Sequence, residues 1–576
     1  MRSSVAMSLA AGAMAVLAGC QQDAVDPSQR VADLLATVPA DTAYLAAATE
    51  HLPDDVFDHY MDVFAPRLAE LLEETQASTL AEKTGESENV AALLGELADY
   101  FRNRDEIQQY RYVIYAVDLF PVLRIELDDP DATLADLRNL HQQLTQAPES
   151  LPAFADQVFQ IHLSEGHLNL NYGIVDRYLM ASVLPSEGAE ALRDQIYSNE
   201  APAAPYDQQA IEQLHQQHGY QGYNYGFVDT LALVDQLMAE HSLMNDWFRL
   251  HEPAAERMQS DAVCQQESRD LAALAPYMSW GITALTDERI TTRTFVELRD
   301  DIATGLSTIP SQLGGTGSDP GGAMAMALSF RVGAMRDFIM QQAGNVRAAP
   351  FQCEHLQSLN DSAEQILAQA GTVMPPFVGQ LRGLKLRIDD FMTMTTEQRP
   401  TGGMVLFVEN AQLLLSMGQM MMPQLASLDI KPDGEPVRID EAVSAMAAGM
   451  VPDGAIYAAL TEQSIAVSSG SEEPTTVTEL MAEPGNGDGA MFSLWLDYAL
   501  LLKQQQQMVD QTLEEAMGDY AERQADTEHE IPDPEKVRRL MNAMYRLYEP
   551  LSRVGTVAMP REGGMVVEQT IDLVNP

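Results

Sequence analysis

The residue with the most definite chemical context is Cys20, which stands at the end of an apolar N-terminal stretch. The stretch runs from Val5 to Leu17 and follows a single positive residue, Arg2. A positive start, a short apolar segment and small residues before a cut site are typical of a secretory signal, and the segment is too short to cross a bilayer as a helix. The sequence therefore predicts export, with a thiol at the start of the mature chain.

The residues directly before this thiol are Leu17, Ala18 and Gly19. A branched apolar residue, two small residues and a cysteine resemble the lipobox of bacterial lipoproteins. The resemblance implies cleavage by signal peptidase II before Cys20, a diacylglycerol on its sulfur and an acyl chain such as palmitate on the freed amine. Each buried methylene contributes about 0.8 kcal/mol, so such chains together form a lasting anchor. The alternative is an ordinary cleaved signal with a chance cysteine at its end.

The residue after the thiol bears on the target membrane. In Gram-negative lipoproteins an aspartate at this position favours retention in the inner membrane, and here the residue is Gln21. By the same resemblance, we expect the chain to be held in the cell envelope by acyl chains on Cys20. The expected site is the outer membrane, with the folded part facing the periplasm.

Two cysteines remain once Cys20 is assigned to lipid, namely Cys264 and Cys353. An oxidising compartment allows them to form a disulfide. The loop they would close has about 90 residues, for which chain entropy allows at most about 4 to 5 kcal/mol of stabilisation. The alternative, a metal site built from Cys353, Glu354 and His355, lacks a fourth ligand at a recognisable spacing. We therefore predict a disulfide and no metal or cofactor.

Other motifs carry weaker signals. No Gly-x-Ser-x-Gly elbow and no His-Glu-x-x-His sequence occurs. The spacing of His215 and His218 can place both on one helical face. They are then either two surface histidines or ligands of a metal site. Methionines gather before Pro423, and we interpret them as core filler, with Cu(I) binding as the alternative. They are Met417, Met420, Met421 and Met422.

Aromatic residues alternate with glycines at the entry to the predicted strand 223–228 and within it. They are Tyr220, Tyr223, Tyr225 and Phe227, interspersed with Gly219, Gly222 and Gly226. Such a pattern is typical of a groove for sugar or peptide, and equally of an irregular entry into a strand. The residues alone leave both interpretations open.

The charge of the chain limits its partners. Its 576 residues include 85 acidic and 34 basic side chains, giving a net charge of -51. Such a balance argues against nucleic acid or bare anionic lipid as a partner. We interpret the charge as a solvated acidic surface. The more specific alternative is recognition of a basic partner or of divalent cations.

The length and one turn-rich segment predict two domains. The segment 309–322 is rich in glycine, proline and serine and has no apolar periodicity. We predict a leader over 1–19, a lipidated tether over 20–30, and α+β domains over 31–308 and 323–576 joined by this linker.

Both sides of the linker end with the same order of predicted elements: strand, helix, strand, aspartate, helix and hairpin. In the first half the strands are 178–183, 223–228, 279–285 and 290–298; in the second they are 464–467, 491–496, 554–559 and 564–571. Asp229 and Asp497 come where a strand turns into a helix, and we interpret both as helix caps, with a catalytic role as the alternative. This order predicts an internal duplication.

Earlier segments follow the same scheme. The further predicted strands are 42–48, 112–117 and 122–127, with counterparts at 325–332, 384–388 and 404–408. Further predicted helices are 54–74, 88–102, 334–345, 354–370 and 411–422. We therefore predict an α+β fold of two related halves, each a mixed and largely antiparallel sheet packed with helices.

Two short phrases resemble a family of exported bacterial proteins of unknown function. They are Val38-Pro39-Ala40-Asp41-Thr42, followed by a strand, and Phe227-Val228-Asp229 at a strand-to-helix junction. The resemblance touches about half of the chain. It implies a periplasmic or surface location and a repeated α+β fold, and it provides no catalytic residues.

These observations predict a membrane-anchored binding or scaffold protein of the bacterial envelope, without catalysis. The expected partners are the bilayer, through the acyl chains on Cys20, and another envelope protein. The alternative is an envelope hydrolase whose site is assembled from dispersed residues, since such sites leave no local motif.

Overall fold

The structure is a computed structural model, and it describes only part of the chain. The described residues are 27–77, 109–145, 158–163, 167–198, 201–239, 242–251, 260–312, 316–370, 375, 377–390, 401–421, 430–439, 455–470, 474–482, 489–503, 506 and 534–574. The predicted signal, the lipobox and the predicted helix 88–102 lie outside these residues.

The chain divides into two compact units, each assembled from separate segments. Unit 1 comprises Met1–Ser260, Pro276–Asp287 and Met508–Pro550. Unit 2 comprises Asp261–Ala275, Glu288–Gln507 and Leu551–Pro576. Each unit therefore takes residues from both sides of the segment 309–322.

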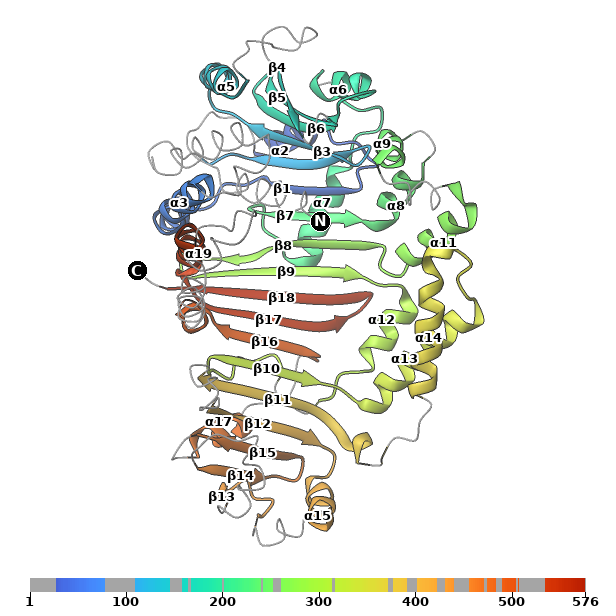
Figure 1. Cartoon of the computed structure of the whole chain (residues 1–576), viewed down its shortest axis with the longest axis vertical. Helices are drawn as coiled ribbons and strands as arrows, with labels where there is room; N and C mark the ends of the chain where they lie inside the picture. Colours follow the sequence, from blue (N-terminus) through green and yellow to red (C-terminus); the bar gives the residue numbers. More distant parts are fainter. Residues whose placement is uncertain are drawn as a thin grey trace, which may run out of the picture. The chain divides into compact units, whose positions relative to one another are not determined.

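Unit 1 contains an antiparallel sheet whose strands pair in the order β4-β5-β6-β3-β2-β1-β7-β8 (Figure 1). The strands are β1 Tyr44–Ala48, β2 Tyr112–Val117, β3 Phe120–Glu126, β4 Val158–Leu163, β5 Leu168–Val175, β6 Tyr178–Pro185, β7 Tyr225–Asp229 and β8 Tyr277–Leu285. Its helices are α2 Pro27–Leu35, α3 Asp54–Ala77, α5 Pro130–Thr145, α6 Glu190–Tyr197, α7 Gln208–His218, α8 Thr230–Met238, α9 Leu243–His251 and α19 Pro534–Tyr548.

Local sequence signals set the ends of the helices. Helix α7 begins after Asp207, whose carboxylate accepts a hydrogen bond from the Gln209 amide at 3.0 Å. It ends at Gly219, whose φ of 74° lies in the left-handed region that favours glycine. A capping carboxylate at one end and a glycine at the other satisfy backbone groups that the helix itself leaves unpaired.

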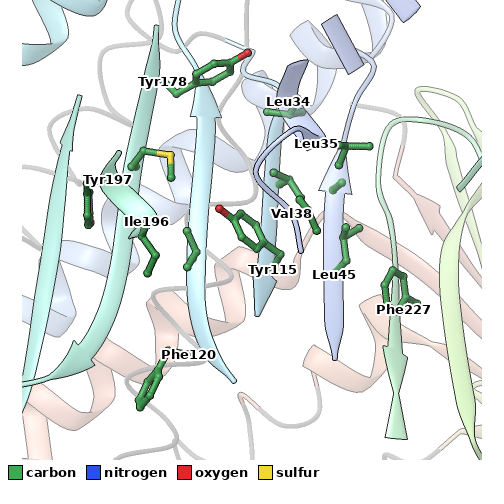
Figure 2. Close-up of a cluster of buried hydrophobic side chains, with 14 of the residues drawn as sticks. Leu34, Leu35, Val38, Leu45, Tyr115, Phe120, Tyr178, Ile196, Tyr197 and Phe227 are labelled. Carbon is green, nitrogen blue, oxygen red and sulfur yellow. The ribbon is translucent and has the colours of Figure 1, made fainter. Parts of the chain in front are cut away.

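The main core of unit 1 lies between α2, α6, α7 and one face of the sheet. Figure 2 shows Leu34, Leu35 and Val38, from α2 and the turn after it, beside Leu45 of β1 and Tyr115 of β2. All of these side chains are buried. Burial of each large apolar side chain contributes about 1.5 to 3 kcal/mol, so α2 is an integral part of this core.

Unit 2 contains a second antiparallel sheet, paired in the order β13-β14-β15-β12-β11-β10-β16-β17-β18-β9 (Figure 1). The strands are β9 Arg289–Glu297, β10 Met324–Ser329, β11 Leu381–Asp390, β12 Thr401–Val408, β13 Val437–Arg438, β14 Ile456–Leu460, β15 Ser464–Ser469, β16 Phe492–Asp497, β17 Leu551–Arg561 and β18 Gly564–Leu573. The helical segments are α11 Ala262–Ala272, α12 Asp300–Ser307, α13 Val332–Ala348, η4 Glu354–Leu356, α14 Gln357–Ala370, η5 Val378–Gln380, α15 Ala411–Met421 and α17 Thr475–Ala482.

The described residues of the predicted linker are packed within unit 2. Ile309 is buried, and its carbonyl accepts a hydrogen bond from the Arg331 amide at 2.7 Å. The Ser311 amide donates to the Ser329 hydroxyl at 3.0 Å, and that hydroxyl donates back to the Ser311 carbonyl at 2.9 Å. These residues therefore belong to the packed fold.

The predicted fold class agrees with the structure in its coarser part: helices accompany a large antiparallel sheet. The predicted strand 112–117 coincides with β2, and the other predicted strands overlap β1, β3, β6 to β12 and β15 to β18. Strands β4, β5, β13 and β14 were not predicted. No helix among the described residues is long and apolar enough to cross a membrane.

Replacement of Leu45 by alanine tests the core of unit 1. Leu45 has 0% of its surface exposed, so we expect the cavity to lower the free energy of unfolding by about 2 to 5 kcal/mol. Urea denaturation followed by circular dichroism measures the change. The matched control is Leu413→Ala on α15, where the leucine is 47% exposed and the expected change is below about 0.5 kcal/mol. Equal effects of the two substitutions would contradict this description of the core.

Candidate functional site

The predicted lipidation site, Cys20 with Leu17, Ala18 and Gly19, lies outside the described residues. The first described residue is Pro27, where α2 begins. Only residues 21–26 therefore separate the predicted anchor from a helix that is part of the core of unit 1.

The other two cysteines lie together in unit 2, as the sequence predicts. The sulfur atoms of Cys264, on α11, and Cys353, just before η4, are 2.08 Å apart, and both residues are buried. The Glu267 carboxylate accepts hydrogen bonds from the amides of Gln352 at 2.7 Å and Cys353 at 2.9 Å, which fixes the same junction. Because its sulfur is bonded to Cys264, Cys353 is not available as a metal ligand.

The two aspartates at strand-to-helix junctions have the same geometry. The Asp229 carboxylate accepts from the Ala232 amide at 2.8 Å, and the Asp497 carboxylate accepts from the Leu500 amide at 2.9 Å. In both cases the acceptor is three residues before the donor, the arrangement of a helix cap. The structure therefore agrees with the capping interpretation.

The histidine pair on α7 does not converge on one point. The ring of His215 lies edge-on to Tyr225, with centroids 4.3 Å apart, and the ring of His218 stacks on Tyr220 at 5.3 Å. His218 is buried. Each ring therefore packs on its own tyrosine. Across the described residues, no group of three or more histidine, cysteine or acidic side chains is placed to hold a metal ion.

The aromatic and glycine pattern forms core, so the groove interpretation is wrong. Tyr220, Tyr225 and Phe227 are buried. A Cβ on Gly226 would lie 2.4 Å from the Trp280 ring and 2.5 Å from the Leu45 carbonyl oxygen. The glycine is therefore needed for close packing of strands and rings.

The core interpretation of the methionine cluster is wrong for Met420. This residue of α15 is 76% exposed, and Met417 is half-buried. The side chains of Met421 and Met422 lie outside what the structure describes. Helix α15 packs on the sheet through Leu414 and Leu415 instead.

The largest feature that sequence reasoning missed is an apolar face of the unit 2 sheet. Residues that pair directly across antiparallel strands point to the same face. Met326 pairs with Leu386 on one side and Leu494 on the other, and Leu494 pairs with Thr556. The register extends through Gln569 of β18 to β9.

We call these residues the apolar face. Its members are Ile290, Thr292, Thr294 and Val296 of β9; Met565, Val567, Gln569 and Ile571 of β18; Val554, Thr556 and Ala558 of β17; Phe492, Leu494 and Leu496 of β16; Met324, Met326 and Leu328 of β10; and Leu384, Leu386 and Ile388 of β11. None is charged, and every one is at least partly exposed. Figure 1 shows α12 and α13 beyond the ends of β17 and β10, not across these strands.

The opposite face of the same strands carries the charges and is the more buried one. Lys385 of β11 is 1% exposed, and Ser329 and Ser493 beside it in the sheet are also buried. Near the other edge of this face, Arg293 of β9 forms an ion pair with Glu568 of β18 at 3.2 Å. Antiparallel sheets usually direct apolar residues inward and polar ones outward. Here the more exposed face is the apolar one, while the opposite face combines these polar groups with a small cluster of buried apolar side chains near β9, β17 and β18.

The apolar face is bounded on one side by a helix. Leu406 of β12 and Ile465 of β15 pack with α15, through Leu414 and Leu415. Met404, which pairs with Leu386, is 44% exposed and extends the face to β12. Among the described residues, α15 therefore covers this side of the sheet only as far as about β12.

The size of the apolar face suits a binding surface. Strands lie about 4.8 Å apart and same-face residues about 6.8 Å apart, so the part from β9 to β11 measures roughly 24 by 20 Å, or roughly 500 Å². Patches of about 300 to 600 Å² are the largest on ordinary monomers and often mark functional sites. This face is the candidate site.

A hollow in unit 2, separate from the apolar face, lies between α12 and α13 and has a volume of about 630 Å³. Asp300, Asp301 and Asp337 lie at its wall, and Asp301 accepts a hydrogen bond from Arg299 at 2.6 Å. The helices approach closely because Gly305 has no side chain: a Cβ there would lie 2.4 Å from the Phe338 ring. The hollow is acidic, and Thr304 and Thr308 also line it.

Comparison with known proteins gave no match. No family model fits the chain, and neither a curated protein nor a solved structure is significantly similar to it.

The disulfide provides one test of this description. In the denatured, unreduced protein, we expect iodoacetamide to label neither Cys264 nor Cys353, and to label both after reduction. Reduction should lower the free energy of unfolding by up to about 4 to 5 kcal/mol. Urea denaturation with and without reductant measures this loss. The double variant Cys264→Ser/Cys353→Ser is the control: a reductant effect that persists in it would contradict the assignment.

The half-buried His215 predicts a dependence of stability on pH. Burial lowers the pKa of His215, and the carboxylate of Glu212 opposes this effect only in part. The unfolded chain therefore binds a proton more readily, so the stabilisation is complete above about pH 6.5 and is lost as the pH falls towards the lower folded pKa. We expect His215→Phe to lose less stability between pH 7.5 and 5.5 than the parent. The exposed His355→Phe is the control, and parallel curves for all three proteins would refute the prediction.

Proposed function

We propose that this protein is a membrane-anchored lipoprotein of the bacterial envelope that binds another envelope component through its apolar face. The anchorage rests on one observation, the Leu17-Ala18-Gly19-Cys20 sequence at the end of an apolar leader. The pairing of Cys264 with Cys353 supports export, because disulfides persist in oxidising compartments. With Cys20 lipidated, each of the three cysteines has a role that fits an exported chain.

The binding role rests on the partly exposed apolar face of the unit 2 sheet. Each Å² of apolar surface that stays in contact with water raises the free energy of the protein by about 25 cal/mol. A partner that covers the face removes this cost. The chain has 85 acidic residues, yet this surface carries no charged side chain. A partner that covers the surface would explain this absence of charge.

We also propose that the two halves arose by duplication of one β-rich unit. Adding nine to each strand number converts the order β4-β5-β6-β3-β2-β1-β7-β8 into β13-β14-β15-β12-β11-β10-β16-β17, the order of the second half. The two halves also share an individual backbone hydrogen bond. The Asp229 amide donates to the Ala43 carbonyl and the Asp497 amide to the Ala323 carbonyl, both at 2.8 Å.

The proposed location is the outer membrane, on the periplasmic side. Gln21 supports this choice over retention in the inner membrane. Because residues 21–26 span at most about 25 Å when extended, the folded chain would lie close to the bilayer surface.

Site-specific photo-crosslinking in native envelopes tests the binding role. A photoreactive phenylalanine analogue at Leu494, in the middle of the apolar face, should capture a recurring component. The same analogue at Gln365, an exposed residue of α14, is the matched control. A Cys20→Ala form should leave the membrane fraction and lose the product. Equal capture from both positions, or none from Leu494, would contradict the proposal, and a Cys20→Ala chain that stays membrane-bound would contradict the anchorage.

A further inference from the structure

The apolar face has a polar spot at one end, and this spot narrows the choice of ligand. Gln569 of β18 pairs with Thr292 of β9 and with Thr556 of β17, and Val567 next along β18 pairs with Thr294. From β17 towards β11 the neighbours of Thr556 are Leu494, Met326 and Leu386, all apolar. The face therefore offers neutral hydrogen-bonding groups at one end and hydrocarbon contacts across the rest.

We propose that the apolar face binds the acyl chain of an uncharged or zwitterionic lipid. The Thr292, Thr556 and Gln569 side chains would hold its ester oxygens, and the hydrocarbon would cross β16, β10 and β11. This inference rests on the proposed function, since it takes the apolar face as the binding surface and names what binds there.

The chemistry of the face favours hydrocarbon over polypeptide. The backbone groups of β16 and β10 are paired on both sides, so the sheet has no free edge here for an added strand. No charged side chain on the face can fix the position of a polar peptide. The methionine side chains of the face are flexible and adapt to the shape of a bound chain.

Size and charge argue against a second copy as the occupant. The face of roughly 500 Å² falls short of the ~800 Å² for each partner that a standard stable interface buries. Two copies would also bring together chains of net charge -51, which repel. The same charge disfavours lipids with an anionic head group.

Binding of a fluorescent lipid tests the inference. The protein is the whole chain carrying Cys20→Ala, purified without detergent, and the probe is lysophosphatidylcholine with a parinaroyl chain. We expect saturable fluorescence enhancement at one probe per chain, with an affinity that changes less than twofold between 50 and 500 mM salt because the ligand carries no net charge. Absence of saturable binding below the probe's micellar concentration would overturn the inference.

Variants assign the binding to the apolar face. Leu494→Lys, which puts a charge beneath the hydrocarbon, should weaken binding at least tenfold. Met326→Gln keeps the length of the side chain and should weaken it about threefold, so it serves if Leu494→Lys fails to fold. Gln569→Leu tests the polar spot and should weaken binding two- to fivefold, with Gln365→Leu on α14 as the matched control. Unchanged affinity in both Leu494→Lys and Met326→Gln would place the lipid elsewhere and refute the inference.

The two proposals fail in distinguishable ways. If crosslinking from Leu494 captures a protein and no lipid binding is found, the proposed binding role is retained and the lipid inference is refuted. If sedimentation shows a dimer that the Leu494→Lys substitution dissociates, that result likewise refutes the lipid inference. If neither a crosslinked component nor lipid binding is found, both proposals fail.

Discussion

The structure of unit 2 depends on the register of its antiparallel strands. Buried backbone amides and carbonyls must be hydrogen-bonded, so each strand is locked to its neighbours along its length. Because successive side chains alternate between faces, one register decides for every residue which side it takes. Pairing of Met326 with Leu386 and Leu494 thereby places these three apolar side chains on one face and Lys385 on the other.

Much of the fold could be predicted from the sequence, because it is encoded in local patterns. Strand β2, Tyr112–Val117, is a continuous β-branched and aromatic run, and α14 follows the apolar period of a helix. Strand β5 was missed because Asn169 and Asn171 interrupt it; both are buried, and Asn171 accepts a hydrogen bond from Gln160 across the strands at 3.1 Å. Strand β14, Ile456–Leu460, is alanine-rich and lacks a strong strand preference.

The candidate site was not predictable in the same way. The alternation in Met324–Ser329 and Phe492–Asp497 is visible in the sequence and indicates strands. It does not indicate which face the helices cover, and the ordinary expectation is that the larger apolar residues face inward. Around β10 the closely packed side is filled by alanine and serine, such as Ala325, Ala327 and Ser493, which depends on tertiary contacts. The disulfide was predictable because export and a count of three cysteines suffice.

The ion pair of Arg293 with Glu568 has a consequence for the history of the chain. It lies at the midpoint of the β9–β18 ladder, which runs from Arg289 opposite Asp572 to Glu297 opposite Gly564. Under the proposed duplication, residues 293 and 568 are the same ancestral position. In a symmetric dimer of separate copies, a residue on the two-fold axis faces its own duplicate, so a charge there meets a like charge. A fused chain, whose halves mutate independently, can place opposite charges on that axis, which a dimer of identical chains cannot.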